Sequence, residues 1–86
     1  QRQAAAIELA RKVDLMLVIG GKNSANTTRL AQLCADECKT YHIETVNEVQ
    51  DNWFDKIEKI GITAGASTPD WIIKEVYEKC KTWKAY

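Results

Sequence analysis

The sequence predicts a three-layer α/β fold, in which a small parallel sheet is flanked by helices. Helical and strand-like segments alternate along the chain, which is typical of a parallel sheet with helical crossovers. Residues 15–19, LMLVI, form a continuous apolar run closed by two glycines, the pattern of a strand buried on both faces. With 86 residues and no repeat, low-complexity segment or linker, the chain is expected to form one domain.

The first half of the chain is predicted to contribute two helices and the central strand. Residues 2–13 form the first helix, and these residues share one face of it at helical spacing: Ala6, Leu9, Ala10 and Val13. The strand follows over residues 14–20. The second helix is expected over residues 27–39, with four side chains facing inward: Leu30, Leu33, Cys34 and Cys38.

The second half adds two strands and the last helix. Residues 41–46, YHIETV, are rich in β-branched residues and half polar, which favours an edge strand. Residues 47–57 read as a short helix or ordered loop with Trp53 and Phe54 turned inward, and residues 59–64 as the third strand. The last helix is predicted over residues 69–83, with these side chains toward the core: Ile73, Val76, Tyr77 and Cys80.

The strand order places a candidate binding site. The right-handed crossover rule limits the topology, and we place strand 14–20 in the middle, strand 41–46 on one side and strand 60–64 on the other. The winding then reverses between the first and third strands. Open α/β sheets bind ligands at such a reversal, beyond the carboxyl ends of the strands.

Two loops rich in glycine and small polar residues leave those same two strands. GGKNSANTT spans residues 20–28, and TAGASTPD spans residues 63–70. Both run into helix starts, for which Asn26 or Thr27 is the expected cap of the first and Thr68, followed by Pro69, of the second. Helix N-termini offer unpaired N–H groups and a partial positive charge, so two that converge predict a phosphate or diphosphate site.

Within these loops, Ser24, Asn26 and Ser67 are the candidate hydrogen-bond donors, and Lys22 is expected to add positive charge. Asp70 counts against an anion unless its carboxylate points outward. The polar residues could also be ordinary helix caps, which leaves a purely structural domain as one alternative. A free-standing phosphate-binding α/β module without redox chemistry is another. Neither a P-loop nor a dinucleotide-binding glycine motif is present in the sequence.

Composition narrows the possible partners. Twelve basic and twelve acidic residues balance, which argues against broad nucleic-acid binding. No apolar run approaches the roughly 20 residues of a membrane span.

The three cysteines have no CxxC spacing and are interpreted as buried free thiols of a reducing cytosol. His42, the only histidine, is interpreted as structural or solvent-facing.

The loop motifs are similar to those of a known enzyme family. GGKNSANTTRL (residues 20–30), followed by GITAGASTPDWII (residues 61–73), closely resembles the C-terminal third of the LytB (IspH) family of 4-hydroxy-3-methylbut-2-enyl diphosphate reductases. Arg2 and Gln3, HIET at residues 42–45 and Trp53 are similar too. The resemblance covers essentially the whole chain and implies that residues 1–86 are the C-terminal diphosphate-binding α/β domain, one of three similar domains, of a longer enzyme.

The resemblance also implies which residues bind substrate. Ser24, Asn26 and Ser67 match diphosphate contacts of the family, and Ala25 stands where many members carry a further liganding serine, so that its backbone N–H remains available. No catalytic residue and no metal ligand is expected within the fragment, which alone is not competent for the reaction.

For the full-length cytoplasmic enzyme, the resemblance implies a [4Fe–4S] cluster, an allylic diphosphate substrate and an electron donor of the ferredoxin or flavodoxin type. The third cluster cysteine is expected just upstream of Gln1, and none of the cluster ligands matches Cys34, Cys38, Cys80 or His42.

Overall fold

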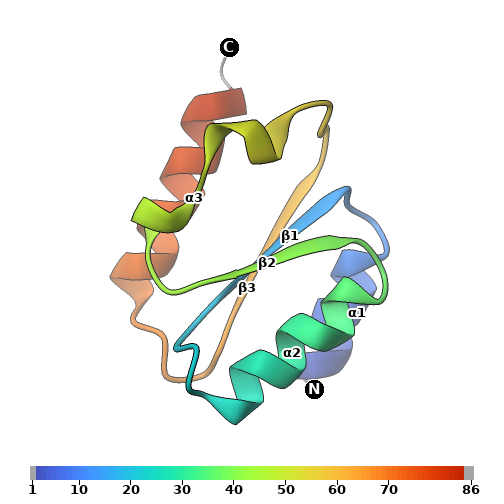
Figure 1. The fold of residues 1–86 in the computed structure, drawn as a ribbon, viewed down its shortest axis with the longest axis vertical. Coiled ribbons are helices and arrows are strands. Elements are labelled where there is room, and N and C mark those ends of the chain that lie inside the picture. The colour runs from blue at the N-terminus through green and yellow to red at the C-terminus, as the bar shows by residue number, and fades with distance from the viewer. Residues whose placement is uncertain (1, 85–86) are drawn as a thin grey trace.

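A parallel sheet of three strands forms the centre of the molecule. The computed structural model describes the backbone of residues 2–84 and the side chains of residues 3–82. The strands are β1 (Leu15–Ile19), β2 (Lys39–Ile43) and β3 (Ile60–Ala64), in the order β2-β1-β3. Both pairings are parallel, so the predicted order and the predicted edge position of the second strand are confirmed (Figure 1).

Helices cover both faces of this sheet, which confirms the three predicted layers. One face carries α1 (Arg2–Ala10) and α2 (Ala25–Ala35). The other carries α3 (Asp70–Lys84) and two 3₁₀ helices, η1 (Val46–Glu48) and η2 (Asp51–Phe54). Figure 1 shows α1 and α2 on one side of the strands and α3 on the other. Among the described residues, none of the helices has the length and apolar character that a membrane crossing requires.

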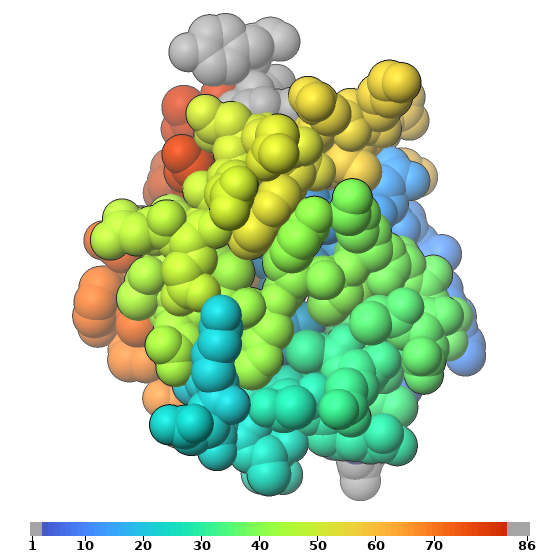
Figure 2. Space-filling model, viewed as in Figure 1, coloured from blue at the N-terminus to red at the C-terminus, as the bar shows by residue number. Residues whose placement is uncertain are grey.

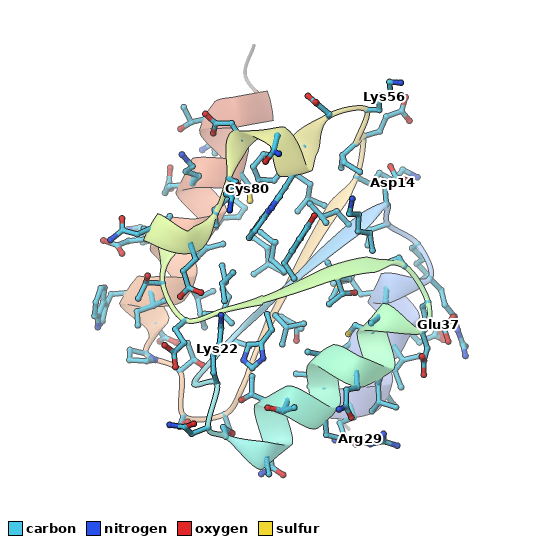
Figure 3. All side chains as sticks on the ribbon, in the orientation of Figure 1. Asp14, Lys22, Arg29, Glu37, Lys56 and Cys80 are labelled. Carbon is cyan, nitrogen blue, oxygen red and sulfur yellow. The ribbon has the colours of Figure 1, made fainter. Side chains whose placement is uncertain are left out.

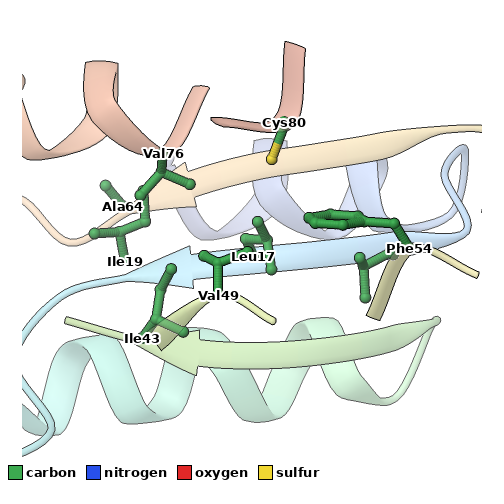
Figure 4. Packing of buried hydrophobic residues seen from close by; sticks show 9 residues of the cluster. Leu17, Ile19, Ile43, Val49, Phe54, Ala64, Val76 and Cys80 are labelled. Atoms are coloured by element: carbon green, nitrogen blue, oxygen red, sulfur yellow. The ribbon is translucent and has the colours of Figure 1, made fainter. Parts of the chain in front are cut away.

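The central strand supplies side chains to both hydrophobic cores. All five residues of β1 are buried, as the apolar run predicted. Because side chains alternate across a strand, Leu15, Leu17 and Ile19 pack toward α3, whereas Met16 and Val18 pack toward α1 and α2. Figure 4 shows the first of these cores, where side chains of β1, the 3₁₀ segments and α3 meet.

Several predicted boundaries were wrong by two to four residues. Helix α1 ends at Ala10, not at residue 13, because the chain turns before β1 and the Asp14 carboxylate accepts the backbone N–H groups of Glu58 and Lys59. Helix α2 spans residues 25–35 instead of 27–39, and a turn joins it to β2. Strand β2 covers residues 39–43 instead of 41–46, since its register follows β1 from Leu15 onward.

The side chains predicted to face the core are only partly buried as predicted. Val76 and Cys80 of α3 are buried, with Ile73 partly buried, but Tyr77 is 53% exposed. The buried stripe is centred on Val76 and Cys80, which turns Tyr77 toward solvent. On α2, Leu30 and Cys34 are buried whereas Leu33 and Cys38 are half-buried, and Cys38 lies beyond the helix end. Phe54 is buried and Trp53 stacks on Tyr41 with ring centroids 3.7 Å apart, as their inward orientation predicted.

Candidate functional site

Two loops lie side by side at the carboxyl edge of the sheet. Loop A (residues 20–24) connects β1 to α2, and loop B (residues 65–69) connects β3 to α3. Because β1 and β3 are neighbours in the sheet, the two loops leave adjacent strand ends and both lead into helix N-termini (Figure 1). This is the placement that the strand order predicted.

Ser24 begins α2. Its backbone is extended (φ −81°, ψ 116°), and its Oγ accepts the N–H of Thr27 at 3.2 Å. The expectation that Asn26 or Thr27 caps this helix was therefore wrong, because Ser24 already occupies the cap position. Ala25 and Asn26 are the first two helical residues, and their N–H groups have no acceptor within the helix.

Loop B is fastened to the end of β1. The N–H of Gly65 and the hydroxyl of Thr68 both donate to the carbonyl of Ile19, at 2.9 and 3.0 Å. Helix α3 then begins at Asp70, so Thr68 and Pro69 lie one residue further from the helix than predicted. Asp70 is exposed. Ser67 is exposed at the tip of loop B, and among the side chains of residues 3–82 and the backbone of residues 2–84 its hydroxyl has no hydrogen-bond partner.

A buried threonine connects the two loops. Thr27 is 2% exposed, and its hydroxyl donates to Ser24 Oγ at 3.1 Å. A Cβ on Gly20 would lie 2.7 Å from Thr27 Cγ2, and a Cβ on Gly65 would overlap Thr27 Oγ1. Glycine at both positions therefore lets the strand ends close around one side chain.

The lysine of loop A points toward η1. Its Nζ lies 3.0 Å from the Glu48 carboxylate, and its backbone N–H donates to Glu44 at 2.8 Å. Figure 3 shows the Lys22 side chain extending from the loop toward the 3₁₀ segments, and in Figure 2 the cyan loop lies against the yellow-green segment. Lys22 thus anchors loop A by an ion pair, which neutralises the charge it was expected to add.

The Glu48 carboxylate binds several groups besides Lys22. It accepts the N–H groups of Glu44 and Thr45 at 2.8 and 3.1 Å. Partial burial raises the pKa of Glu48, but the hydrogen bonds from Lys22 and these two N–H groups outweigh it and hold the pKa below its ordinary value of 4.5. This carboxyl is therefore ionised at neutral pH. The Thr45–Glu48 spacing is a capping-box signal that sequence reasoning missed.

The structure brings the four predicted substrate-binding residues to one edge. Ala25, Asn26 and Ser67 are exposed, and Ser24 is half-buried. Sequence reasoning missed Thr27 as the link between the loops, and the only available signal was a Ser-x-x-Thr spacing at a helix start. His42 is structural, since its Nε2 lies 3.0 Å from the carbonyl oxygen of Gly20.

The cysteines lie away from this edge. All three are free thiols: Cys34, Cys38 and Cys80. Burial raises the pKa of Cys34 and Cys80, and for Cys38 burial likewise outweighs the hydrogen bond from Thr40. These upward shifts describe thiols without a bound metal, and the packing of the side chains decides whether they can share one. Within residues 2–84, no group of three or more His, Cys, Asp and Glu side chains is placed to hold a metal ion.

Comparisons with known proteins find similar chains. A curated relative from Syntrophotalea carbinolica, named 4-hydroxy-3-methylbut-2-enyl diphosphate reductase, is 58% identical over 79 residues. A relative of the same name from Geobacter sulfurreducens is 57% identical over 79 residues. Each match covers 91% of this chain and 28% of the relative, so the chain spans little more than a quarter of the length of these proteins.

Two solved structures are similar over nearly the whole chain. One is described as (E)-4-hydroxy-3-methyl-but-2-enyl diphosphate reductase, the terminal enzyme of the non-mevalonate pathway. It matches with a TM-score of 0.91 and 49% identity, over 94% of this chain and 29% of that one. The reductase from Plasmodium falciparum matches with a TM-score of 0.85 and 25% identity, over 91% of this chain and 25% of that one. The model of the family described as LytB protein matches residues 1–81, and this chain belongs to the LytB family.

Proposed function

We propose that residues 1–86 are the C-terminal diphosphate-binding domain of a 4-hydroxy-3-methylbut-2-enyl diphosphate reductase of isoprenoid biosynthesis. The family match and the relatives that bear this name support the proposal. The whole enzyme takes an allylic diphosphate and, with two electrons and two protons, removes its hydroxyl as water to leave isopentenyl and dimethylallyl diphosphates. A ferredoxin- or flavodoxin-type protein supplies the electrons in the cytoplasm.

The observation that carries the proposal is the convergence of two helix-leading loops at one sheet edge. The hydroxyl of Ser67 is exposed and has no partner within the described residues, and the side chain of Asn26 is exposed on the first turn of α2, at the same edge of the sheet. The N–H groups of Ala25 and Asn26 add unpaired donors at the positive end of the α2 dipole. Such an array of donors favours an anion with many acceptor oxygens, as a diphosphate has.

The role of this chain is therefore to hold the diphosphate end of the substrate. Binding the diphosphate restricts the position of the hydroxyl at the opposite end of the substrate, because the substrate is short. Binding energy from a non-reacting group then contributes to the turnover rate as well as to substrate capture.

The residues present do not fit the iron–sulfur cluster that the family implies. Such clusters are held by several cysteine thiolates, whereas Cys80 lies on one side of the sheet and Cys34 and Cys38 lie on the other, and no metal-binding group of side chains exists among the described residues. We assign the cluster ligands to the rest of the longer enzyme and no redox step to this chain.

The test compares the Ser67→Ala variant with the unmodified protein, both as the full-length enzyme. Hydrogen bonds to charged groups are worth about 1.5–3 kcal/mol, so kcat/KM for the allylic diphosphate should fall by about ten- to a hundredfold. Ser67 is the sharpest choice, because removing its hydroxyl breaks no hydrogen bond within the described residues. Ser24→Ala should lose at least as much, but it also removes a helix cap worth about 1 kcal/mol of stability.

Thr82→Ala is the matched control, since Thr82 is an exposed hydroxyl residue near the far end of α3. Its kcat/KM should equal that of the unmodified enzyme. An unchanged kcat/KM for Ser67→Ala would mean that loop B only leads into a helix and that the diphosphate binds elsewhere.

A further inference from the structure

We propose that Thr27 is a positioning residue that aims the hydroxyl proton of Ser24 at the diphosphate. Thr27 is 2% exposed and therefore cannot itself contact a ligand at the surface of the site. Its influence has to pass through Ser24, which among the described residues is the one side chain hydrogen-bonded to its hydroxyl. The inference rests on the proposed function, because it assumes that Ser24 binds a phosphate oxygen.

The hydrogen bonds around Ser24 determine where its proton points. A serine hydroxyl has one proton to donate and two acceptor sites. Ser24 Oγ accepts the N–H of Thr27 at 3.2 Å and the hydroxyl of Thr27 at 3.1 Å, so both acceptor sites are filled. The Ser24 proton is then left to donate to a third group, and the exposed side of the loop is where such a group can lie.

The direction of the hydroxyl–hydroxyl bond follows from burial. Thr27 Oγ1 makes no other hydrogen bond among the described residues, and a buried hydroxyl proton without an acceptor is costly. The Thr27 proton therefore goes to Ser24, and Ser24 donates outward. A hydroxyl that accepts two hydrogen bonds is also a stronger donor, because chains of hydrogen bonds polarise one another.

The packing around Thr27 holds its hydroxyl in this position. Gly20 and Gly65 contact the threonine from the ends of β1 and β3, and an added Cβ on either glycine would collide with it. The side chain is thus confined from two strands. The same contacts fix loop B relative to Ser24, so that the two loops present their donors at a constant separation.

The experiment is a double-mutant cycle in the full-length enzyme. Two quantities are measured for each variant: the inhibition constant of inorganic diphosphate as a competitive inhibitor, and kcat/KM for the allylic diphosphate. Thr27→Val keeps the shape of the side chain and removes the hydroxyl, so the inhibition constant should rise by about five- to tenfold. Thr27→Ser keeps the hydroxyl and loses a methyl group. Its inhibition constant should therefore lie within about twofold of that of the unmodified enzyme, while its melting temperature should be lower. In the Ser24→Ala background, Thr27→Val should change the inhibition constant by less than about twofold.

Three outcomes would overturn the inference: an unchanged inhibition constant for Thr27→Val, an equal loss for Thr27→Ser, or the same loss with and without Ser24. If Thr27→Val does not fold, Thr27→Ala compared with Thr27→Ser decides the same question. A normal Thr27→Val enzyme beside a weakened Ser67→Ala enzyme would reject this inference alone. Unchanged inhibition in both Ser67→Ala and Ser24→Ala would instead reject the proposed function.

Discussion

At the scale of single residues, the site consists of small side chains with few atoms between the backbone and the donor group. Ser24, Asn26 and Ser67 reach the sheet edge directly from helix starts and a tight turn. The long side chain in the motif, Lys22, is held by Glu48 instead and stabilises loop A from behind. The donors proposed for the diphosphate are therefore short hydroxyl and amide groups together with backbone N–H groups.

At position 25, a hydroxyl side chain should strengthen the binding of diphosphate. Ala25 is exposed and is the first residue of α2, directly after the Ser24 cap. In the full-length enzyme, Ala25→Ser should lower the inhibition constant of inorganic diphosphate by about two- to tenfold, because one hydroxyl adds about 0.5–1.5 kcal/mol of net hydrogen bonding. Ala35→Ser, on an exposed residue at the other end of α2, is the control and should leave the constant unchanged. Equal constants for Ala25→Ser and the control would show that position 25 does not face the ligand.

At the scale of elements, the site depends on how closely two strand ends approach one helix. The carbonyl of Ile19 accepts two hydrogen bonds from loop B, and Thr27 of α2 fills the space between the loops. Loop A is also tied to η1 through Glu44 and Glu48. The loops are therefore held from β1, from α2 and from the 3₁₀ segment, which keeps exposed donors in place without a ligand.

Gly65→Ala tests this close approach. The new Cβ would overlap Thr27 Oγ1, so we expect a loss of about 1–3 kcal/mol in stability and weaker binding of inorganic diphosphate. Gly21→Ala is a matched control in loop A, because its Cβ would meet only a Glu44 oxygen 3.8 Å away. Thermal unfolding and inhibition by inorganic diphosphate, both measured on the full-length enzyme, check the pair. Equal melting temperatures and inhibition constants for the two variants would contradict the packing described here.

At the scale of the whole molecule, the sheet separates Cys80 from Cys34 and Cys38. Cys34 and Cys38 belong to the core beneath α1 and α2, whereas Cys80 belongs to the core beneath α3. The three sulfur atoms therefore cannot converge on one iron–sulfur cluster without unfolding the sheet.

Replacing all three cysteines by alanine in the full-length enzyme should leave its iron–sulfur absorbance intact. Some stability will be lost at the buried positions 34 and 80, because the substitutions remove packed atoms. The visible spectrum, with circular dichroism to confirm folding, is the measurement. A folded variant that has lost the cluster band would show that at least one of these thiols is a ligand.

Much of the fold could be predicted because its signals are local. The buried run at residues 15–19, the polar edge strand and the glycine-rich turns each depend on neighbours in sequence, and together they placed the two loops at one edge. Helix ends were less predictable: α1 ends at Ala10, and the following turn leads to Asp14, whose carboxylate is bound to residues 58 and 59, far away in the sequence. The role of Ser67 as a substrate contact stays a prediction.

By itself, the sequence determined the α/β class, the strand order, the loops that meet beyond β1 and β3, and the likeness to one enzyme family. Only the tertiary structure decided which side chains of those loops face outward. Lys22 turned to Glu48, and Thr27 became the buried link between Gly20 and Gly65. The physical reason is that burial and ion pairing depend on residues distant in the chain: Glu48 lies 26 positions from Lys22, and Gly65 lies 38 positions from Thr27. Periodicity and turn chemistry describe a segment, whereas the orientation of a polar side chain is settled by what the folded chain brings next to it.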